Sequence, residues 1–156
     1  MNSKNFGPAE PVAERSALAR ILVIDDDAAV REATLIMLEA RGFDVVAVEN
    51  GQLGLEAVKA GAFDAVIVDL FMPGMDGLAT TRAIHQYSPA TPIIAVSGFM
   101  FRGRCPTMPD FQPMAMEAGA VAALYKPLRP CQVLQTIADA MAVQHRKLQL
   151  ISQLSS

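Results

Sequence analysis

The sequence contains no tryptophan, only two cysteines, and few aromatic side chains, which make up 6% of its 156 residues. Cys105 and Cys131 are far apart, and neither has a second cysteine or a histidine at metal-ligand spacing. The sequence therefore gives no support for a disulfide or a zinc site, and we expect both cysteines to be free thiols. His85 and His145 also lack acidic or cysteine partners at ligand spacing, so we assign them no chemistry.

Long apolar runs and basic clusters are missing as well. The formal net charge is −3, which argues against binding to nucleic acid or to anionic lipid, because either needs clustered Lys and Arg. No stretch is long enough to span a bilayer, and residues 1–20 lack the apolar centre of a secretory signal. These absences favour a cytoplasmic protein whose partners are other proteins, with no direct contact to nucleic acid or membrane.

The apolar residues, 52% of the chain, are enough for the core of one compact domain. Residues 1–19 show no periodicity and are expected to form a flexible leader. The domain is expected over residues 20–150, with a C-terminal tail over 151–156. No DNA-binding or enzymatic output domain is expected to follow.

Within that domain, short apolar strand patterns alternate with helical patterns. Strands are expected at Ile21–Ile24, Asp44–Val48, Ala65–Asp69, Ile93–Val96 and Val121–Tyr125, and helices at Ala28–Arg41, Gln52–Ala60, Leu78–Tyr87, Met114–Ala118 and from about Pro130 onward. Continuous branched runs such as Ile21–Ile24 are typical of strands that are covered on both faces. The pattern predicts a doubly wound α/β fold, in which helices pack on both faces of a five-stranded parallel sheet.

Polar side chains follow four of these strands at their carboxyl ends. The first strand is followed by Asp25, Asp26 and Asp27, the third ends on Asp69, the fourth is followed by Ser97, and the fifth by Lys126. Ligands of open parallel sheets bind at this edge, so these side chains are expected to converge. Clustered carboxylates repel one another unless a cation neutralises them, and oxygen ligands at an open site suit Mg²⁺.

At these positions the chain resembles the receiver domain of bacterial two-component response regulators, in particular single-domain receivers of the chemotaxis type. The resemblance covers about residues 20–142 and rests on Ile24-Asp25-Asp26-Asp27, Val68-Asp69, Met72-Pro73-Gly74-Met75-Asp76-Gly77, Val96-Ser97-Gly98 and Lys126-Pro127. It implies a flavodoxin-like strand order, 2-1-3-4-5.

The resemblance also implies a metal site. Asp26 matches the direct acidic ligand of Mg²⁺, Asp25 a ligand acting mainly through water, and the backbone carbonyl of Phe71 the third protein ligand. Asp69 belongs to the same metal set, whereas Asp27 lies outside it.

The resemblance assigns the phosphoryl chemistry as well. Asp69 matches the phosphoacceptor, which takes its phosphoryl group from a sensor histidine kinase or a histidine phosphotransfer protein. Lys126 and the Ser97 hydroxyl match the groups that hold two of the phosphoryl oxygens. The peptide bond between Lys126 and Pro127 is expected to be cis. Such a domain is not a turnover enzyme, because it accepts a phosphoryl group, assists its own transfer and loses the group slowly.

Phosphorylation is expected to shift the equilibrium between two conformations of the surface formed by the fourth helix, fifth strand and fifth helix. We expect a downstream protein, which the sequence does not identify, to bind this surface. The domain is expected to be a monomer or to form a weak dimer through the same surface.

Two features depart from the family pattern. The aromatic residue usually found three positions before the lysine is replaced here by Ala123, and Phe99 or Phe101 could substitute for it or could simply pack under their loop. The segment Phe99–Pro113 is longer than usual and could be a partner-binding surface, a lid or a tolerated insertion. In addition, Phe71 and Phe99 are expected to hinder the water that removes the phosphoryl group.

Two other classes of protein share parts of this pattern. A magnesium phosphohydrolase also uses an Asp nucleophile at a strand end, but it needs an acid one turn away, and Asp69-Leu70-Phe71 offers none. A flavin-binding module of the same strand order needs a Ser/Thr- and Gly-rich loop after the first strand, where this chain has three acids.

Overall fold

The computed structural model describes residues 18–72, 74, 76–98 and 111–155. Five parallel strands form one sheet in the order β2-β1-β3-β4-β5. Their bounds are β1 (Arg20–Ile24), β2 (Asp44–Val48), β3 (Ala65–Asp69), β4 (Ile93–Ser97) and β5 (Ala122–Tyr125). The predicted doubly wound α/β fold and its 2-1-3-4-5 order are confirmed.

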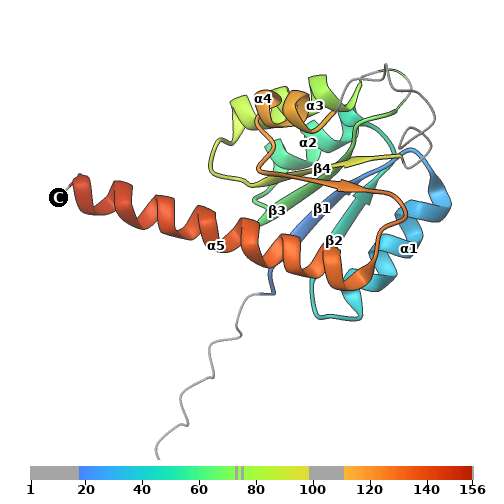
Figure 1. Ribbon diagram of the computed structural model, residues 1–156, viewed down its shortest axis with the longest axis horizontal. Helices are drawn as coiled ribbons and strands as arrows, with labels where there is room; N and C mark the ends of the chain where they lie inside the picture. The colour runs from blue at the N-terminus through green and yellow to red at the C-terminus, as the bar shows by residue number, and fades with distance from the viewer. Residues whose placement is uncertain (1–17, 73, 75, 99–110, 156) are drawn as a thin grey trace, which may run out of the picture.

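Helices cover both faces of the sheet. Their bounds are α1 (Ala28–Glu39), α2 (Gly51–Ala60), α3 (Gly77–Tyr87), α4 (Phe111–Ala118) and α5 (Pro130–Leu154). Helices α1 and α5 lie against one face, and α2, α3 and α4 against the other (Figure 1).

The central strand β1 shows why its sequence is apolar throughout. Ile21 and Val23 pack into the core on the α1 and α5 side, while Leu22 and Ile24 pack into the core on the α2 and α3 side. Because successive side chains of a strand point to opposite faces, a strand covered on both faces needs an apolar residue at every position. β3 and β4 are buried in the same way.

The ends of the first two helices differ slightly from the predicted ones. α1 ends at Glu39 rather than Arg41, and Gly42 follows with a φ of +86°, the left-handed backbone that favours glycine. α2 begins at Gly51, one residue before the predicted start. Its N-cap is Asn50, whose side-chain oxygen accepts a hydrogen bond from the Leu53 amide at 2.8 Å.

The two last helices differ more. α4 begins at Phe111 rather than Met114, because Pro113 stands in its first turn, where a missing backbone N–H costs nothing. Residues 111–113 of the predicted long segment are therefore helical, and 99–110 lie outside the described residues. α5 runs on to Leu154, so most of the predicted tail continues the helix.

The described residues include no helix that combines the length and the apolar character needed to cross a membrane. Of the predicted leader, residues 1–17 lie outside the described part of the chain.

Candidate functional site

The predicted site residues come together at the carboxyl edge of the sheet. β1 and β3 are neighbours, and Ile24 pairs with Val68, so the next residues, Asp25 and Asp69, lie side by side. The strand order reverses between these two strands, which is where doubly wound sheets bind ligands. Lys126 reaches the same point from the end of β5.

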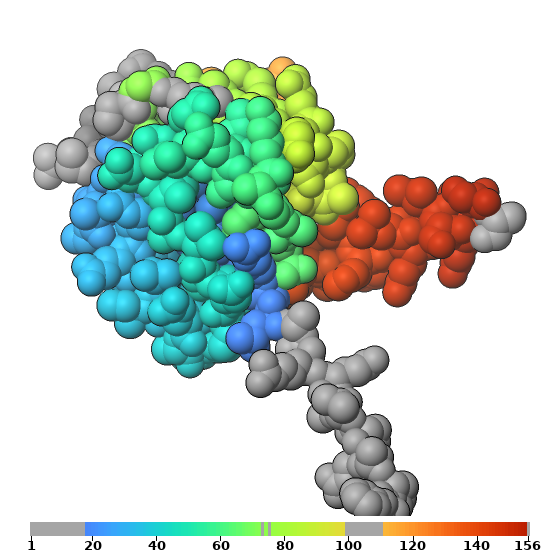
Figure 2. All heavy atoms as spheres, turned by 180° about the vertical axis from the view of Figure 1, so that it is seen from behind, coloured from blue at the N-terminus to red at the C-terminus, as the bar shows by residue number. Residues whose placement is uncertain are grey.

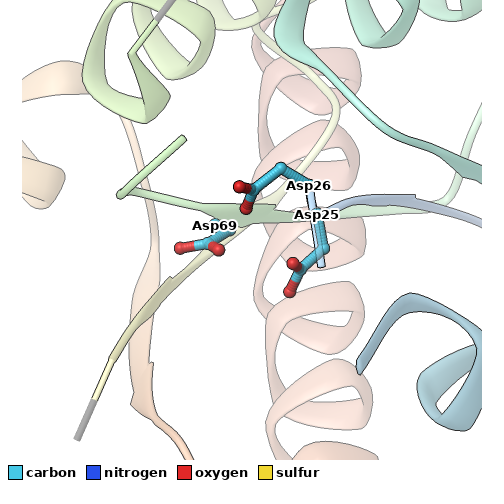
Figure 3. A group of neighbouring side chains, drawn as sticks. All are labelled: Asp25, Asp26 and Asp69. Carbon is cyan, nitrogen blue, oxygen red and sulfur yellow. The ribbon is translucent and has the colours of Figure 1, made fainter. Parts of the chain in front are cut away.

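Three carboxylates form an acidic cluster there. One oxygen from each of Asp25, Asp26 and Asp69 lies within 4.8 Å of the others. Figure 3 shows the Asp26 carboxylate turned toward Asp69, with Asp25 beside them. Asp25 and Asp69 are buried, whereas Asp26 is exposed, so the cluster faces solvent on one side. Several oxygen ligands at an open site fit a hard cation such as Mg²⁺, and the cluster could hold one.

Lys126 bridges the two buried carboxylates. Its Nζ lies 2.9 Å from Asp25 Oδ2 and 3.0 Å from Asp69 Oδ2, and its side chain is 20% exposed. The pairing with Asp69 was expected through a shared phosphoryl group, but the ion pair with Asp25 was not. No sequence signal indicates that ion pair, because it depends on where the tip of a long side chain lies in the folded protein.

Backbone amides fix the orientation of both buried acids. The Phe71 amide donates to Asp69 Oδ1 at 3.0 Å, and the Asp27 amide donates to Asp25 Oδ1 at 2.9 Å. In each carboxylate, one oxygen thus accepts from the backbone and the other from Lys126. Hydrogen bonds of this kind to an ionised acceptor are stronger than those between neutral groups, so they hold the two carboxylates in place.

Asp27 has a different partner, which explains why it lies outside the cluster. It is the N-cap of α1, and its Oδ1 accepts hydrogen bonds from the amides of Ala29 and Val30 at 3.0 and 3.2 Å. The third acid of the trio therefore stabilises the start of a helix.

Burial raises the pKa of Asp69 above its ordinary value, although the Phe71 amide and the Lys126 ammonium both act to lower it. For Lys126, burial acts to lower the pKa, but the hydrogen bonds to Asp25 and Asp69 outweigh it and the pKa is raised. Lys126 is therefore a permanent cation near neutral pH, and it partly neutralises the two acids.

Ser97 is the last residue of β4 and is 5% exposed. Its backbone carbonyl accepts a hydrogen bond from the Lys126 amide at 2.8 Å, which joins the ends of β4 and β5. Ser97 and Lys126 are thus held together by the sheet itself. The Lys126-Pro127 peptide bond is cis, as expected.

The backbone of Asp69 is closely covered by the start of α3. A side chain at Gly77 would overlap the Asp69 carbonyl oxygen and the Leu70 Cα. Only glycine allows this close approach. The Asp76 side chain caps α3 by accepting a hydrogen bond from the Ala79 amide at 2.6 Å. Asp76 therefore starts the helix, and Gly77 allows it to pack against β3.

Phe71 makes a contact that the sequence did not suggest. Its ring packs edge-to-face on Phe111, with ring centroids 4.6 Å apart and planes at 89°. The contact links the segment just after Asp69 to the first residue of α4. Ala123 lies half-buried in β5, and the alternative aromatic residues Phe99 and Phe101 lie outside the described residues.

These elements together define a class of protein. The class is that of doubly wound α/β domains with an acidic cluster and a lysine at the switch point of a 2-1-3-4-5 sheet. The model of the response regulator receiver domain matches residues 21–138, and the chain belongs to this family of two-component signalling domains.

Individual relatives agree with this assignment. The chain is 35% identical over 133 residues to the sensory/regulatory protein RpfC of Xanthomonas campestris, and the match covers 83% of this chain and 17% of RpfC. The chain is also 32% identical over 118 residues to the DNA-binding response regulator MtrA of Mycobacterium leprae, and this match covers 76% of this chain and 49% of MtrA. This chain therefore spans less than half of the length of either relative.

Solved structures agree as well. A CheY-like receiver domain from Methanospirillum hungatei matches with a TM-score of 0.75 and 27% identity, over 84% of this chain and 99% of that one. The receiver domain of the sensor histidine kinase PA1611 from Pseudomonas aeruginosa, whose structure has a magnesium ion coordinated in its active-site cleft, matches with a TM-score of 0.69 and 23% identity, over 81% of this chain and 99% of that one.

Proposed function

We propose that this domain is switched by transfer of a phosphoryl group from a phosphohistidine to the carboxylate of Asp69. The observation that carries the proposal is the position of Asp69, a buried carboxylate that Lys126 contacts at 3.0 Å beside two further acids. An Asp69 oxygen would attack phosphorus while the bond between phosphorus and the imidazole nitrogen breaks. The imidazole leaves with the electron pair of that bond, and an acyl phosphate remains on Asp69.

The residues around Asp69 support each part of this transfer. Lys126 lies where its ammonium can neutralise charge on a phosphoryl oxygen, and Ser97 is held next to it by the hydrogen bond between their backbones. The Phe71 amide holds the carboxylate in a fixed orientation. The chain therefore supplies positioning and electrostatic stabilisation, which are the main protein contributions to phosphoryl transfer.

We propose Mg²⁺ as the cation of the acidic cluster. Asp25, Asp26 and Asp69, together with the carbonyl of Phe71, are the residues that would hold it, and their oxygen donors suit a hard ion. When bound, Mg²⁺ supplies positive charge that offsets the repulsion among the carboxylates and the phosphoryl oxygens.

Replacing the exposed acid of the cluster tests the metal site. Asp26→Asn should weaken Mg²⁺ binding by about tenfold or more, because one charged ligand becomes a neutral one. Titration calorimetry with Mg²⁺ measures this directly. The rate of phosphorylation by a small acyl-phosphate donor should fall with it at low Mg²⁺ and recover in part at high Mg²⁺.

Asp27→Asn is the matched control for Asp26→Asn. It removes the same charge one residue away, and Asn is as good an N-cap as Asp, so α1 should be preserved. If both variants bound Mg²⁺ like the wild type, the metal would not lie at this cluster.

A groove beside the site offers a place for the phosphodonor. It has a volume of about 310 Å³, lies between α1 and the start of α5, and is mostly apolar. Val30, Ala33 and Met37 line one side, and Pro127 and Leu128 the other, with Lys126 shared between groove and site. A donor must bring its histidine to Asp69, so we propose that a histidine kinase or histidine phosphotransfer protein covers this groove during transfer.

Two connections support a response on the face formed by α4, β5 and α5. Lys126 joins the end of β5 to the buried carboxylate, and the Phe71 ring joins the segment after Asp69 to α4 through Phe111. A phosphoryl group on Asp69 adds negative charge, which would draw hydrogen-bond donors and cations toward its oxygens. The Lys126–Asp69 ion pair and the Phe71–Phe111 contact would both change as a result. We propose that a downstream protein binds this face in its changed conformation.

Phe71 should also lengthen the lifetime of the phosphorylated state. Its side chain is 39% exposed and stands two residues after Asp69, where it limits the approach of water to phosphorus. Phe71→Asn should shorten the half-life of the phosphorylated protein severalfold, because a polar side chain of smaller volume admits and orients water. The decay is followed on a phosphate-retarding gel after the donor is removed.

Phe71→Leu separates bulk from polarity, since it keeps an apolar group near the site. It should leave the half-life close to that of the wild type. A half-life unchanged by Phe71→Asn would contradict the proposed hindrance.

A further inference from the structure

Arg31 connects helix α1 to the turn that carries two acids of the cluster. It lies near the start of α1, four residues after the N-cap Asp27, and its backbone amide donates to the Asp27 carbonyl at 2.9 Å. Long side chains of a helix lean back toward its N-terminus. The Arg31 side chain does so here, and its Nη1 donates to the backbone carbonyl of Asp25 at 2.8 Å.

Each polar group of Asp25 has a partner, and Arg31 is one of them. The Asp25 amide donates to the Val48 carbonyl at 3.1 Å. One carboxylate oxygen accepts from the Asp27 amide and the other from Lys126. The fourth group, the backbone carbonyl, accepts from Arg31. Because the Arg31 donor is charged, this hydrogen bond is stronger than one between two neutral groups, and it fixes the backbone at this point.

The carboxylate of Asp26 has no hydrogen-bond or ion-pair partner among the described residues, and it is exposed. Its direction therefore depends on the backbone. The Asp25 carbonyl and the Asp26 amide belong to one planar peptide unit, so the donor that holds the carbonyl also sets the position of the Asp26 Cα. On the other side, the N-cap hydrogen bonds of α1 hold Asp27. From this fixed backbone the Asp26 carboxylate turns toward Asp69 (Figure 3).

We propose that Arg31 is a positioning residue of the Mg²⁺ site, which holds the Asp25 carbonyl and thereby keeps the Asp26 carboxylate where it binds the ion. This inference rests on the proposed Mg²⁺ site. Within the described part of the chain, Arg31 forms no ion pair with a carboxylate, so it acts through the backbone. Groups that orient the ligands of a metal set its affinity although they do not touch it.

A simpler role for Arg31 would be to neutralise the acidic cluster with its charge. This role predicts the opposite effect of a substitution, because a cation beside the cluster repels Mg²⁺ and its removal should strengthen Mg²⁺ binding. The contacts favour positioning, since Arg31 donates to a neutral carbonyl, whereas Lys126 pairs with two carboxylates. The sign of the change in Mg²⁺ affinity separates the two roles.

The place of Arg31 on α1 makes it suitable for substitution. α1 lies at the surface of the domain, on the side away from the C-terminal end of α5 (Figures 1 and 2). Arg31 is half-buried, whereas the buried residues of α1 are Thr34 and Leu38. The apolar groove between α1 and α5 is lined from α1 by other residues, namely Val30, Ala33, Thr34 and Met37. A substitution at Arg31 should therefore leave the core and the groove intact.

Titration calorimetry of the metal-free protein with Mg²⁺ tests the proposal. Arg31→Met removes the donor, and it should weaken Mg²⁺ binding about tenfold because the Asp26 carboxylate loses its fixed position. Arg31→Gln, whose amide is too short to reach the carbonyl, should weaken it to a similar extent. Arg31→Lys keeps a charged donor of nearly the same length and should bind Mg²⁺ within about threefold of the wild type. Thermal unfolding monitored by circular dichroism checks that each variant is folded.

Arg41→Met is the matched control for Arg31→Met. It removes the same charge from an exposed position beyond the other end of α1. Because that charge is distant from the cluster and screened by salt, the Mg²⁺ affinity should change by less than about twofold. Equal losses of affinity in Arg31→Met and Arg41→Met would overturn the proposal.

A double-mutant cycle with Asp26→Asn tests whether Arg31 acts through Asp26. In the Asp26→Asn background, Arg31→Met should weaken Mg²⁺ binding by less than about twofold, because the ligand that Arg31 positions has already lost its charge. A general loosening of the site would instead give the same loss in both backgrounds. That result would overturn the positioning role.

The same titrations distinguish a failure of this inference from a failure of the proposed Mg²⁺ site. If the wild type binds Mg²⁺ and Asp26→Asn weakens the binding, an Arg31→Met protein with unchanged or higher affinity would overturn the role of Arg31 alone. A wild type that binds no Mg²⁺ would overturn the metal site and this inference with it. We expect the affinity to fall in Arg31→Met and to be largely restored in Arg31→Lys.

Discussion

Asp69→Asn should abolish phosphorylation of this protein. The amide of Asn is not a nucleophile toward phosphorus, whereas the rest of the site stays in place because Asn can still accept from the Phe71 amide. The variant and the wild type are incubated with Mg²⁺ and a small acyl-phosphate donor and compared on a phosphate-retarding gel. We expect a retarded band for the wild type and none for the variant.

Asp139→Asn is the control for Asp69→Asn. Asp139 is exposed on α5, where its Oδ1 accepts a hydrogen bond from Gln135 at 2.9 Å. It is remote from the acidic cluster, so this variant should be phosphorylated as fast as the wild type. A retarded band that survives in Asp69→Asn would mean that another residue accepts the phosphoryl group.

Lys126→Met should have the second-largest effect, lowering the phosphorylation rate by about 10²- to 10³-fold at saturating Mg²⁺. Methionine keeps the length and the apolar stem of the lysine but removes the ammonium that contacts Asp25 and Asp69. Without this ammonium, the negative charge that develops on the phosphoryl oxygens during transfer loses one stabilising cation. The rate is measured from the time course of the same gel assay.

The loss of Lys126 should also be visible without any donor. The two buried carboxylates would face each other with no cation between them, so the pKa of Asp69, already raised by burial, should rise further in the absence of metal. Lys59→Met, which replaces an exposed lysine of α2, is the control and should leave the rate unchanged. A Lys126→Met protein phosphorylated at the wild-type rate would remove the lysine from the mechanism.

The sequence predicted most of the fold because the three central strands, β1, β3 and β4, are covered on both faces. Runs such as Ile21–Ile24 carry an unmistakable pattern when every position must be apolar, and the polar residues that follow mark the carboxyl edge. The convergence of Asp25, Asp69 and Lys126 followed from strand topology alone, and the structure brings them together.

The features that could not be predicted are those set by tertiary contacts. α4 begins three residues before the predicted start at Met114, and Pro113 lies in its first turn. A proline usually indicates a break in a helix, so the sequence pattern did not extend the helix across it. The Phe71–Phe111 contact joins residues forty positions apart, and no local periodicity encodes it. α5 extends to Leu154 and is capped by Ser155, without a glycine or proline that would mark its end in the sequence.

Locating the phosphoryl group by mass spectrometry tests the central proposal most directly. The wild-type protein is phosphorylated with a small acyl-phosphate donor and Mg²⁺ and then reduced with borohydride, which converts an aspartyl phosphate to homoserine. We predict that the peptide containing Asp69 carries this change at that residue and that no other peptide does. A modification found at Asp25, Asp26 or a histidine, with Asp69 unaltered, would contradict the proposal.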